Sequence, residues 1–163
     1  MGFFRRPDDH ARVEEWTVGV TNHRVIVGGT ERGIPAVADL RGYVASVTGG
    51  PERPKRDGRD SVAVLSAKMD LAELVNDECV AVLLTFEDLV SRGLVRADEV
   101  PAPPELPPIP LRGDHYDYIQ AAHRRAEVRM AWLDRADRVL GAHRVVLLPP
   151  LPKEDPALRP GRR

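Results

Sequence analysis

The turn at Gly28, Gly29 and Thr30 carries residue types that suit the binding of a phosphate group. Glycine lets the backbone approach a ligand closely, so the amide groups of such a turn can point at an anion. The hydroxyl group of Thr30 would add one further donor. A tight connection between a strand and a helix needs the same residues, so a purely structural interpretation of the turn stays open.

A second candidate site is electrostatic and lies in a loop rich in basic side chains. The basic residues of this loop are Arg53, Lys55, Arg56 and Arg59. Such a cluster can contact the phosphates of DNA through charge alone. Acidic residues interleave with the basic ones in the same loop, which favours an ordinary solvated loop. DNA is therefore a second candidate partner, after protein.

The sequence offers no clear candidate for catalysis or for metal binding. Asp114, His115 and Asp117 lie close together where a helix is expected to begin, but Asp114 is more simply explained as a helix cap. The other histidines are scattered, and no P-loop, GxSxG or HExxH motif occurs. The single cysteine, Cys79, excludes an intramolecular disulfide and suits a small buried side chain. We therefore expect no cofactor, no metal and no enzymatic activity.

The composition is that of an ordinary soluble protein. Among 163 residues, 25 acidic side chains offset 24 lysines and arginines, and the net charge is −1. This balance does not call for nucleic acid or a membrane surface as a partner. No apolar run reaches the roughly 18 residues of a membrane span, and the first residues do not resemble a signal peptide. We expect a cytoplasmic protein without membrane contact.

The elements that must position these residues are predicted from alternating apolar patterns. Strands are predicted at residues 16–20, 24–27, 61–66 and 79–84, and helices at residues 34–47, 71–77 and 86–92. Residues 80–84 are apolar on every side, and Thr85 looks like a fresh helix cap, so a strand is preferred there over one continuous helix. The alternation predicts an α/β fold with a mainly parallel sheet.

The C-terminal third of the sequence has a different character. Six prolines within residues 101–110 predict a stiff, extended linker. Residues 114–140 form the clearest predicted helix, about 40 Å long, and a short strand is predicted at residues 144–148. The apolar face of this helix includes Tyr118, Val128 and Trp132. These three residues are candidate contacts to a partner or to a second copy of the chain, although folding back on the domain is the more common outcome.

Three stretches of the sequence together carry a family resemblance. The first reads Arg-Val-Ile-Val-Gly-Gly-Thr at residues 24–30 and is followed by the pair Gly49 and Gly50. The second reads Ser-Val-Ala-Val-Leu at residues 61–65. The third begins with Lys68, has Ala72 four residues later, and continues with apolar residues 80–84 and with Phe-Glu-Asp-Leu-Val at residues 86–90. In this order and spacing, residues 23–95 resemble a bacterial BRCT domain.

The resemblance implies a four-stranded, mainly parallel sheet flanked by helices and a binding scaffold without chemistry of its own. Members of the family contact proteins, in some cases phosphopeptides or DNA ends, and recur in DNA repair and replication. Lys68 stands at the family's phosphate-binding lysine, and the start of the helix expected at Leu71 would support an anion there. Gly28 stands where the family has Ser or Thr.

The predicted organisation has five parts. They are an N-terminal arm with an extra strand (1–22), the BRCT-like domain (23–97), the proline-rich linker (98–113), the C-terminal helix with its strand (114–148) and a disordered tail (149–163). The function predicted is binding or scaffolding of a protein or of a phosphate-bearing ligand. Two alternatives stay open: an assembly protein, such as one from a phage, that uses the C-terminal helical arm, and a small Rossmann-type enzyme with residues 28–33 as its phosphate loop.

Overall fold

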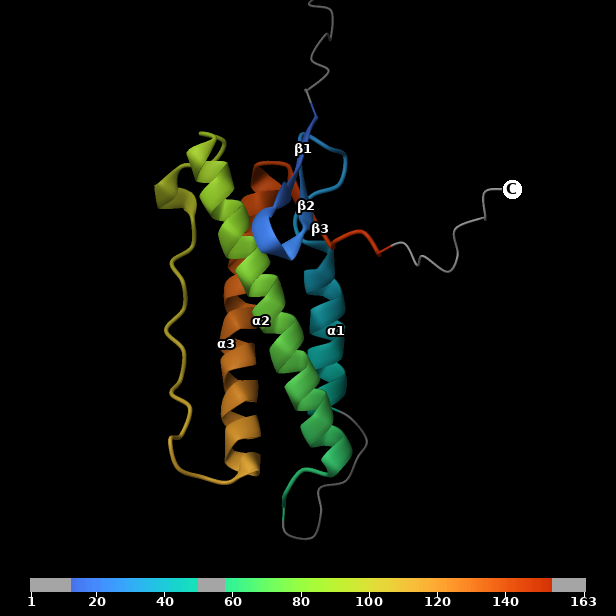
Figure 1. Cartoon of the computed structure of the whole chain (residues 1–163), viewed down its shortest axis with the longest axis vertical. Coiled ribbons are helices and arrows are strands. Elements are labelled where there is room, and N and C mark those ends of the chain that lie inside the picture. Colours follow the sequence, from blue (N-terminus) through green and yellow to red (C-terminus); the bar gives the residue numbers. More distant parts are fainter. Residues whose placement is uncertain (1–12, 50–57, 154–163) are drawn as a thin grey trace, which may run out of the picture.

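The computed structural model describes residues 13–49 and 58–153, which form a small sheet at one end of three long helices (Figure 1). The strands are β1 (Glu14–Val18), β2 (His23–Val27) and β3 (Val145–Leu148). The helices are α1 (Pro35–Gly49), α2 (Val62–Ser91) and α3 (His115–Ala142), with 3-10 turns at Gly19–Thr21 and Ala97–Glu99. The helices predicted at 34–47 and 114–140 and the strands predicted at 24–27 and 144–148 are therefore confirmed, and the first predicted strand is shifted to β1.

The sheet has three strands in the order β1-β2-β3, and both pairs are antiparallel. Val25 at its centre pairs with Trp16 of β1 and with Leu147 of β3, and its side chain is fully buried. The turn between β1 and β2 is short, and Asn22 takes the left-handed conformation that such a turn needs. The four-stranded, mainly parallel sheet predicted from the sequence is wrong, because two of its expected strands belong to a helix.

Helix α2 is continuous over the residues predicted as two strands and two shorter helices. Its cap is Ser61, whose hydroxyl accepts a hydrogen bond from the Val64 amide at 3.3 Å. Thr85 caps nothing: its hydroxyl donates to the Ala81 carbonyl at 2.8 Å, one turn back within the helix. The strands predicted at 61–66 and 79–84 and the helix ends predicted at 77 and 86 are therefore wrong.

Helix α2 tolerates apolar side chains around its whole circumference because it has neighbours on several sides. It packs on α3, on α1 and on β1. Ala81 and Val82 are fully buried, whereas Val80 and Leu83 keep 40% and 38% of their surface exposed. Residues 80–84 are thus uniformly apolar because they belong to a central helix that is covered over most of its circumference.

Helices α2 and α3 lie side by side and run in the same direction (Figure 1). After α2 ends, the chain runs back alongside α3 to the point where α3 begins. Residues 101–113, here called the proline strap, make this return. Thirteen residues at about 3.1 Å each span about 40 Å, and the 28 residues of α3 span about 42 Å. An extended strap therefore matches the helix that it must pass.

The proline strap is held by hydrogen bonds that α3 donates to its carbonyl groups. Trp132 Nε1 donates to the Pro101 carbonyl at 3.1 Å, and Arg125 Nε donates to the Pro107 carbonyl at 2.7 Å. Proline has no amide hydrogen, so these residues leave fewer donors in need of a partner. The segment predicted as a linker is therefore a packed part of the fold.

Trp132 lies in the hydrophobic core and contacts Phe86 of α2 edge to face, with 6.4 Å between ring centres. It is 1% exposed and thus offers no surface to a partner, contrary to its predicted role. Of the other two predicted contacts, Val128 is half-buried and Tyr118 is exposed and stacked on His115. Cys79 is buried as expected, and burial raises the pKa of its thiol to about 12.

Replacing Trp132 by Phe should lower the free energy of unfolding by about 2 kcal/mol, because the Pro101 carbonyl loses its donor and the core loses volume. Urea unfolding followed by circular dichroism measures the change. Tyr118→Phe, at an exposed position of the same helix, is the control and should change stability by less than about 0.5 kcal/mol. Equal stability of Trp132→Phe and the wild type would contradict the strap anchor.

Candidate functional site

The structure does not bring the residues predicted to bind phosphate together. Lys68 lies on α2, where its Nζ donates to Asp60 Oδ2 at 2.6 Å and to Gln120 Oε1 at 2.9 Å. The hydrogen bond from Lys68 is the main reason why the pKa of Asp60 is lowered. Lys68 thus joins the start of α2 to the start of α3, and its charge is already engaged.

The turn after β2 lies at the other end of α3. The Gly28 amide donates to the Arg144 carbonyl at 3.1 Å, and the Arg144 side chain donates to the carbonyls of Gly28 and Gly29 at 3.4 and 3.2 Å. Thr30 is exposed beside them. Since Gln120 is near the start of α3 and Arg144 just beyond its end, the turn and Lys68 are separated by about 36 Å along the helix.

The basic loop is described only in part. Arg53, Lys55 and Arg56 lie outside the described residues, whereas Arg59 lies 3.8 Å from a carboxylate oxygen of Asp114 and over the ring of Tyr116. Asp114 caps α3, as predicted, by accepting the Asp117 amide at 3.0 Å.

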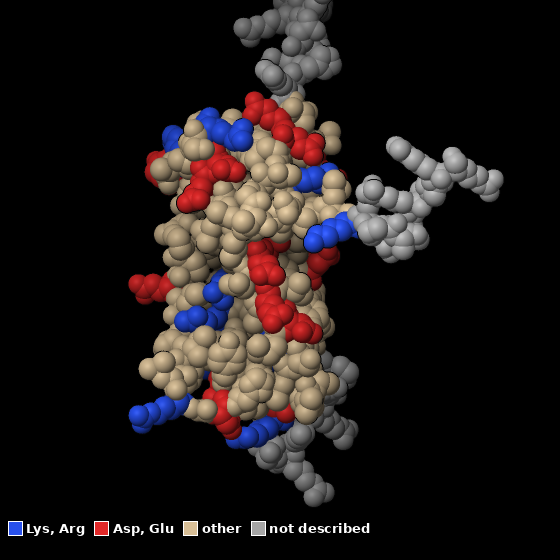
Figure 2. All heavy atoms as spheres, in the orientation of Figure 1, with Lys and Arg blue, Asp and Glu red and all other residues tan. Residues whose placement is uncertain are grey.

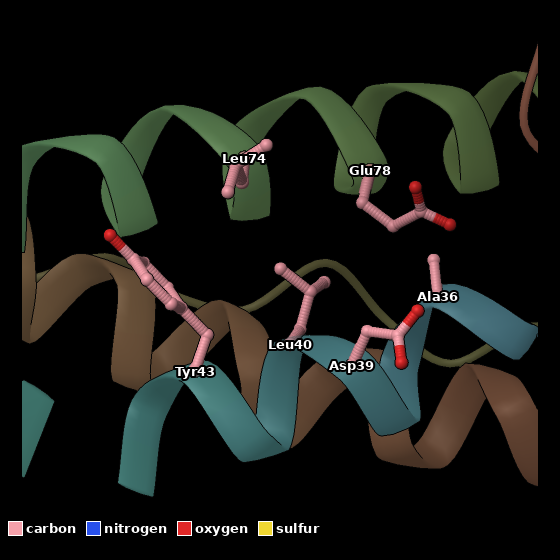
Figure 3. Close-up of a pocket in the computed structure, with 6 residues that line it drawn as sticks. All are labelled: Ala36, Asp39, Leu40, Tyr43, Leu74 and Glu78. Atoms are coloured by element: carbon pink, nitrogen blue, oxygen red, sulfur yellow. The ribbon is translucent and has the colours of Figure 1, made fainter. Parts of the chain in front are cut away.

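The strongest candidate site is a hollow between α1 and α2 that no sequence motif indicated. A pocket of about 360 Å³ is lined by Ala36, Asp39, Leu40, Tyr43, Leu74 and Glu78 (Figure 3). A second hollow of about 410 Å³ shares Tyr43 and Leu74 and adds Asp70, Glu73 and Asp77. These nine residues define what is here called the α1–α2 groove.

The floor of the α1–α2 groove is apolar. Leu40 is 7% exposed and belongs to the core, and Tyr43 packs partly against that core. Leu74 lies opposite them on α2 and is 52% exposed. A large apolar side chain that is half exposed inside a hollow can gain from contact with a partner.

The rim of the α1–α2 groove is acidic. Asp39 comes from α1, and Asp70, Glu73 and Asp77 come from α2. Acidic side chains gather in the middle of the face shown in Figure 2. The residues that line the two hollows include no lysine and no arginine. The groove therefore has a negative potential that attracts positively charged partners.

Glu78 is the least ordinary residue of the groove, because its charge is buried without full compensation. It is 8% exposed, and its Oε2 lies 3.5 Å from Nε2 of His23. Its Oε1 is buried and has no hydrogen-bond partner among the residues that the structure describes. A buried carboxylate oxygen without a donor is costly and therefore needs an explanation.

His23 partly neutralises this charge. It is the first residue of β2, and its hydrogen bond to Glu78 is the main cause of its raised pKa, which burial opposes. A second histidine, His123 on α3, has the opposite shift, because burial lowers its pKa. Folding therefore makes His23 easier to protonate and His123 harder to protonate.

The sequence carries two signals for the groove, and both depend on one long helix at residues 62–91. If residues 62–91 are drawn as one helix, Asp70, Glu73 and Asp77 follow one another at helical spacing beside Leu74. On the same helix, position 78 falls within the buried stripe of apolar residues, where a carboxylate is unexpected. Asp39 and Tyr43 could not be added without knowing that α1 lies beside α2.

The fold and the groove define a class: a mostly helical α+β domain with an acidic, apolar-floored groove between two helices. Comparison with protein-family models, with curated proteins and with solved structures gives no match to this chain. None of the helices in the described ranges combines the length and apolarity that a membrane span needs. Within those ranges, no group of three or more His, Cys, Asp or Glu side chains could hold a metal ion.

The His23–Glu78 pair should make stability depend on pH. Because the folded-state pKa of His23 is raised above its ordinary value of 6.5, the pair stabilises the fold fully below about pH 6.5. This contribution is lost as the pH rises through the folded-state pKa. The difference in unfolding free energy between wild type and His23→Gln should therefore be largest below about pH 6.5 and shrink as the pH is raised from there to about pH 9.

Urea unfolding of both proteins over this pH range measures that difference. His123 is present in both, so its opposite effect cancels in the comparison. A difference that stays constant or grows with pH would contradict the pairing of His23 with Glu78.

Proposed function

We propose that this chain is a non-enzymatic protein-binding module whose α1–α2 groove holds a basic amphipathic helix of a partner protein. The observation that carries the proposal is Leu74, half exposed on an apolar floor and surrounded by acidic side chains. A helix that lays apolar residues into a groove between helices is a common mode of peptide recognition. Lysine or arginine beside those residues would meet the acidic rim.

The charge of the groove supports a protein partner over nucleic acid. Asp39, Asp70, Glu73 and Asp77 would repel the phosphates of DNA, and the described part of the basic loop engages its one arginine, Arg59, in contacts to α3. The setting in DNA repair or replication that the BRCT resemblance implied stays a prediction.

The other functions considered receive less support from the fold. A phosphate-binding role would need Lys68 near the turn at Gly28, and the two lie about 36 Å apart along α3. A Rossmann-type enzyme needs a parallel sheet, whereas this sheet is antiparallel. Assembly through α3 loses its main predicted contact, Trp132, to the core, and association through exposed parts of that helix stays a prediction.

A labelled helical peptide of about 14 residues, with leucine on one face and four arginines beside it, tests the proposal by fluorescence anisotropy. Its matched control carries glutamate in place of every arginine. We expect the wild-type chain to bind the arginine peptide and not the glutamate peptide. Leu74→Glu should weaken that binding about tenfold or more, because the apolar floor is interrupted by a charge.

Leu83→Glu is the matched control variant. Leu83 is nine residues from Leu74, or two and a half helical turns, so it lies on the opposite side of α2 with a comparable exposure of 38%. The Leu83→Glu variant should bind the arginine peptide with the affinity of the wild type. Absence of binding by the wild type, or equal weakening by the two substitutions, would overturn the proposed function.

A further inference from the structure

We infer that the α1–α2 groove contains a subsite for a single arginine side chain, formed by the carboxylates of Glu78 and Asp39. The inference rests on the proposed function and names the feature of the partner that the groove recognises. Figure 3 shows the side chains of Glu78 on α2 and of Asp39 on α1 in the space between the two helices, and both line the pocket. The two acidic groups therefore line the same pocket from opposite walls.

The unsatisfied oxygen of Glu78 indicates that the ligand of this subsite is positively charged. Its Oε1 is buried and has no partner among the described residues, while Oε2 is near His23. One histidine at 3.5 Å compensates a buried carboxylate only in part, and only when it is protonated. A donor that brings a permanent charge to Oε1 would satisfy the oxygen and neutralise the second carboxylate at Asp39.

The surroundings of the two carboxylates favour arginine over other cations. A guanidinium group has five donors in one plane, so it can serve two carboxylates on facing walls at the same time. Its apolar stem can lie along apolar surface while the charged end reaches inward. Leu40, Ala36 and Leu74 provide such a surface beside Glu78 in the pocket.

The test replaces each of the four arginines of the peptide, one at a time, by citrulline, which has the same shape without the charge. For the wild-type chain, one of the four replacements should weaken binding about tenfold, and the other three should weaken it much less. For Glu78→Gln, binding of the parent peptide should be weaker, and citrulline at that same position should cause little further loss.

Asp77→Asn is the control. It removes one charge from the rim, at the residue before Glu78, and leaves unchanged the six residues that line the pocket of Glu78 and Asp39. It should lower affinity modestly and keep the full effect of citrulline. Asp39→Asn provides a second variant of the subsite that leaves the His23–Glu78 pair intact, and it should also reduce the effect of citrulline. Thermal unfolding establishes that each variant is folded at the temperature of the assay.

Two results would overturn the inference. If citrulline has the same effect in the wild type, Glu78→Gln and Asp39→Asn, the groove attracts basic peptides without an arginine subsite, and the proposed function stands alone. If light scattering shows that the full chain associates with itself and that Leu74→Glu abolishes this association, the occupant is a second copy of the chain.

Discussion

The parallel packing of α2 on α3 is the constraint on which the rest of the structure depends. Two neighbouring helices of about 40 Å that run in the same direction need a connection that returns over their whole length. A helix would need about 27 residues for that return, whereas the proline strap needs 13. Trp132 and Arg125 hold the strap against α3.

This arrangement also explains where the groove lies. Helix α2 packs on α3, on β1 and on α1, and α1 also contacts α3 and β3, so all three helices and the sheet contribute to one core. Along the contact of α1 with α2 the helices leave hollows between Tyr43 and Leu74 and between Asp39 and Glu78. Val37 and Leu40 anchor α1 in the core, and the groove is the part of the α1–α2 contact that side chains leave unfilled.

The sequence predicts the elements whose apolar faces have a clear period. α1 and α3 have a polar face, and β2 and β3 are short runs bounded by turns, so all four were found within about two residues. Helix α2 was missed because residues 80–84 have no polar position, and only distant parts of the chain decide that this run is helical. The parallel sheet and the BRCT-like fold were built on that run and on residues 61–66, so the predicted architecture failed with them.

The candidate site could be predicted only in fragments, because two helices far apart in the sequence form it. The turn at Gly28 and the residue Lys68 were chosen for their chemistry, yet each already has a partner in the fold. With a helix predicted at 71–77 and a strand at 79–84, Glu78 falls in the connection between them, where a carboxylate is ordinary. Within one long helix the same residue is a charge on a buried stripe, which is a physical signal of function.

The central claim, that the groove between α1 and α2 is the binding face, is tested most directly by nuclear magnetic resonance of the chain with labelled leucine and alanine methyl groups. Titration with the arginine peptide should shift the methyl signals of Leu74, Leu40 and Ala36 and leave that of Leu83 in place. Shifts confined to α3 or to the sheet, with the three groove signals unchanged, would contradict the account.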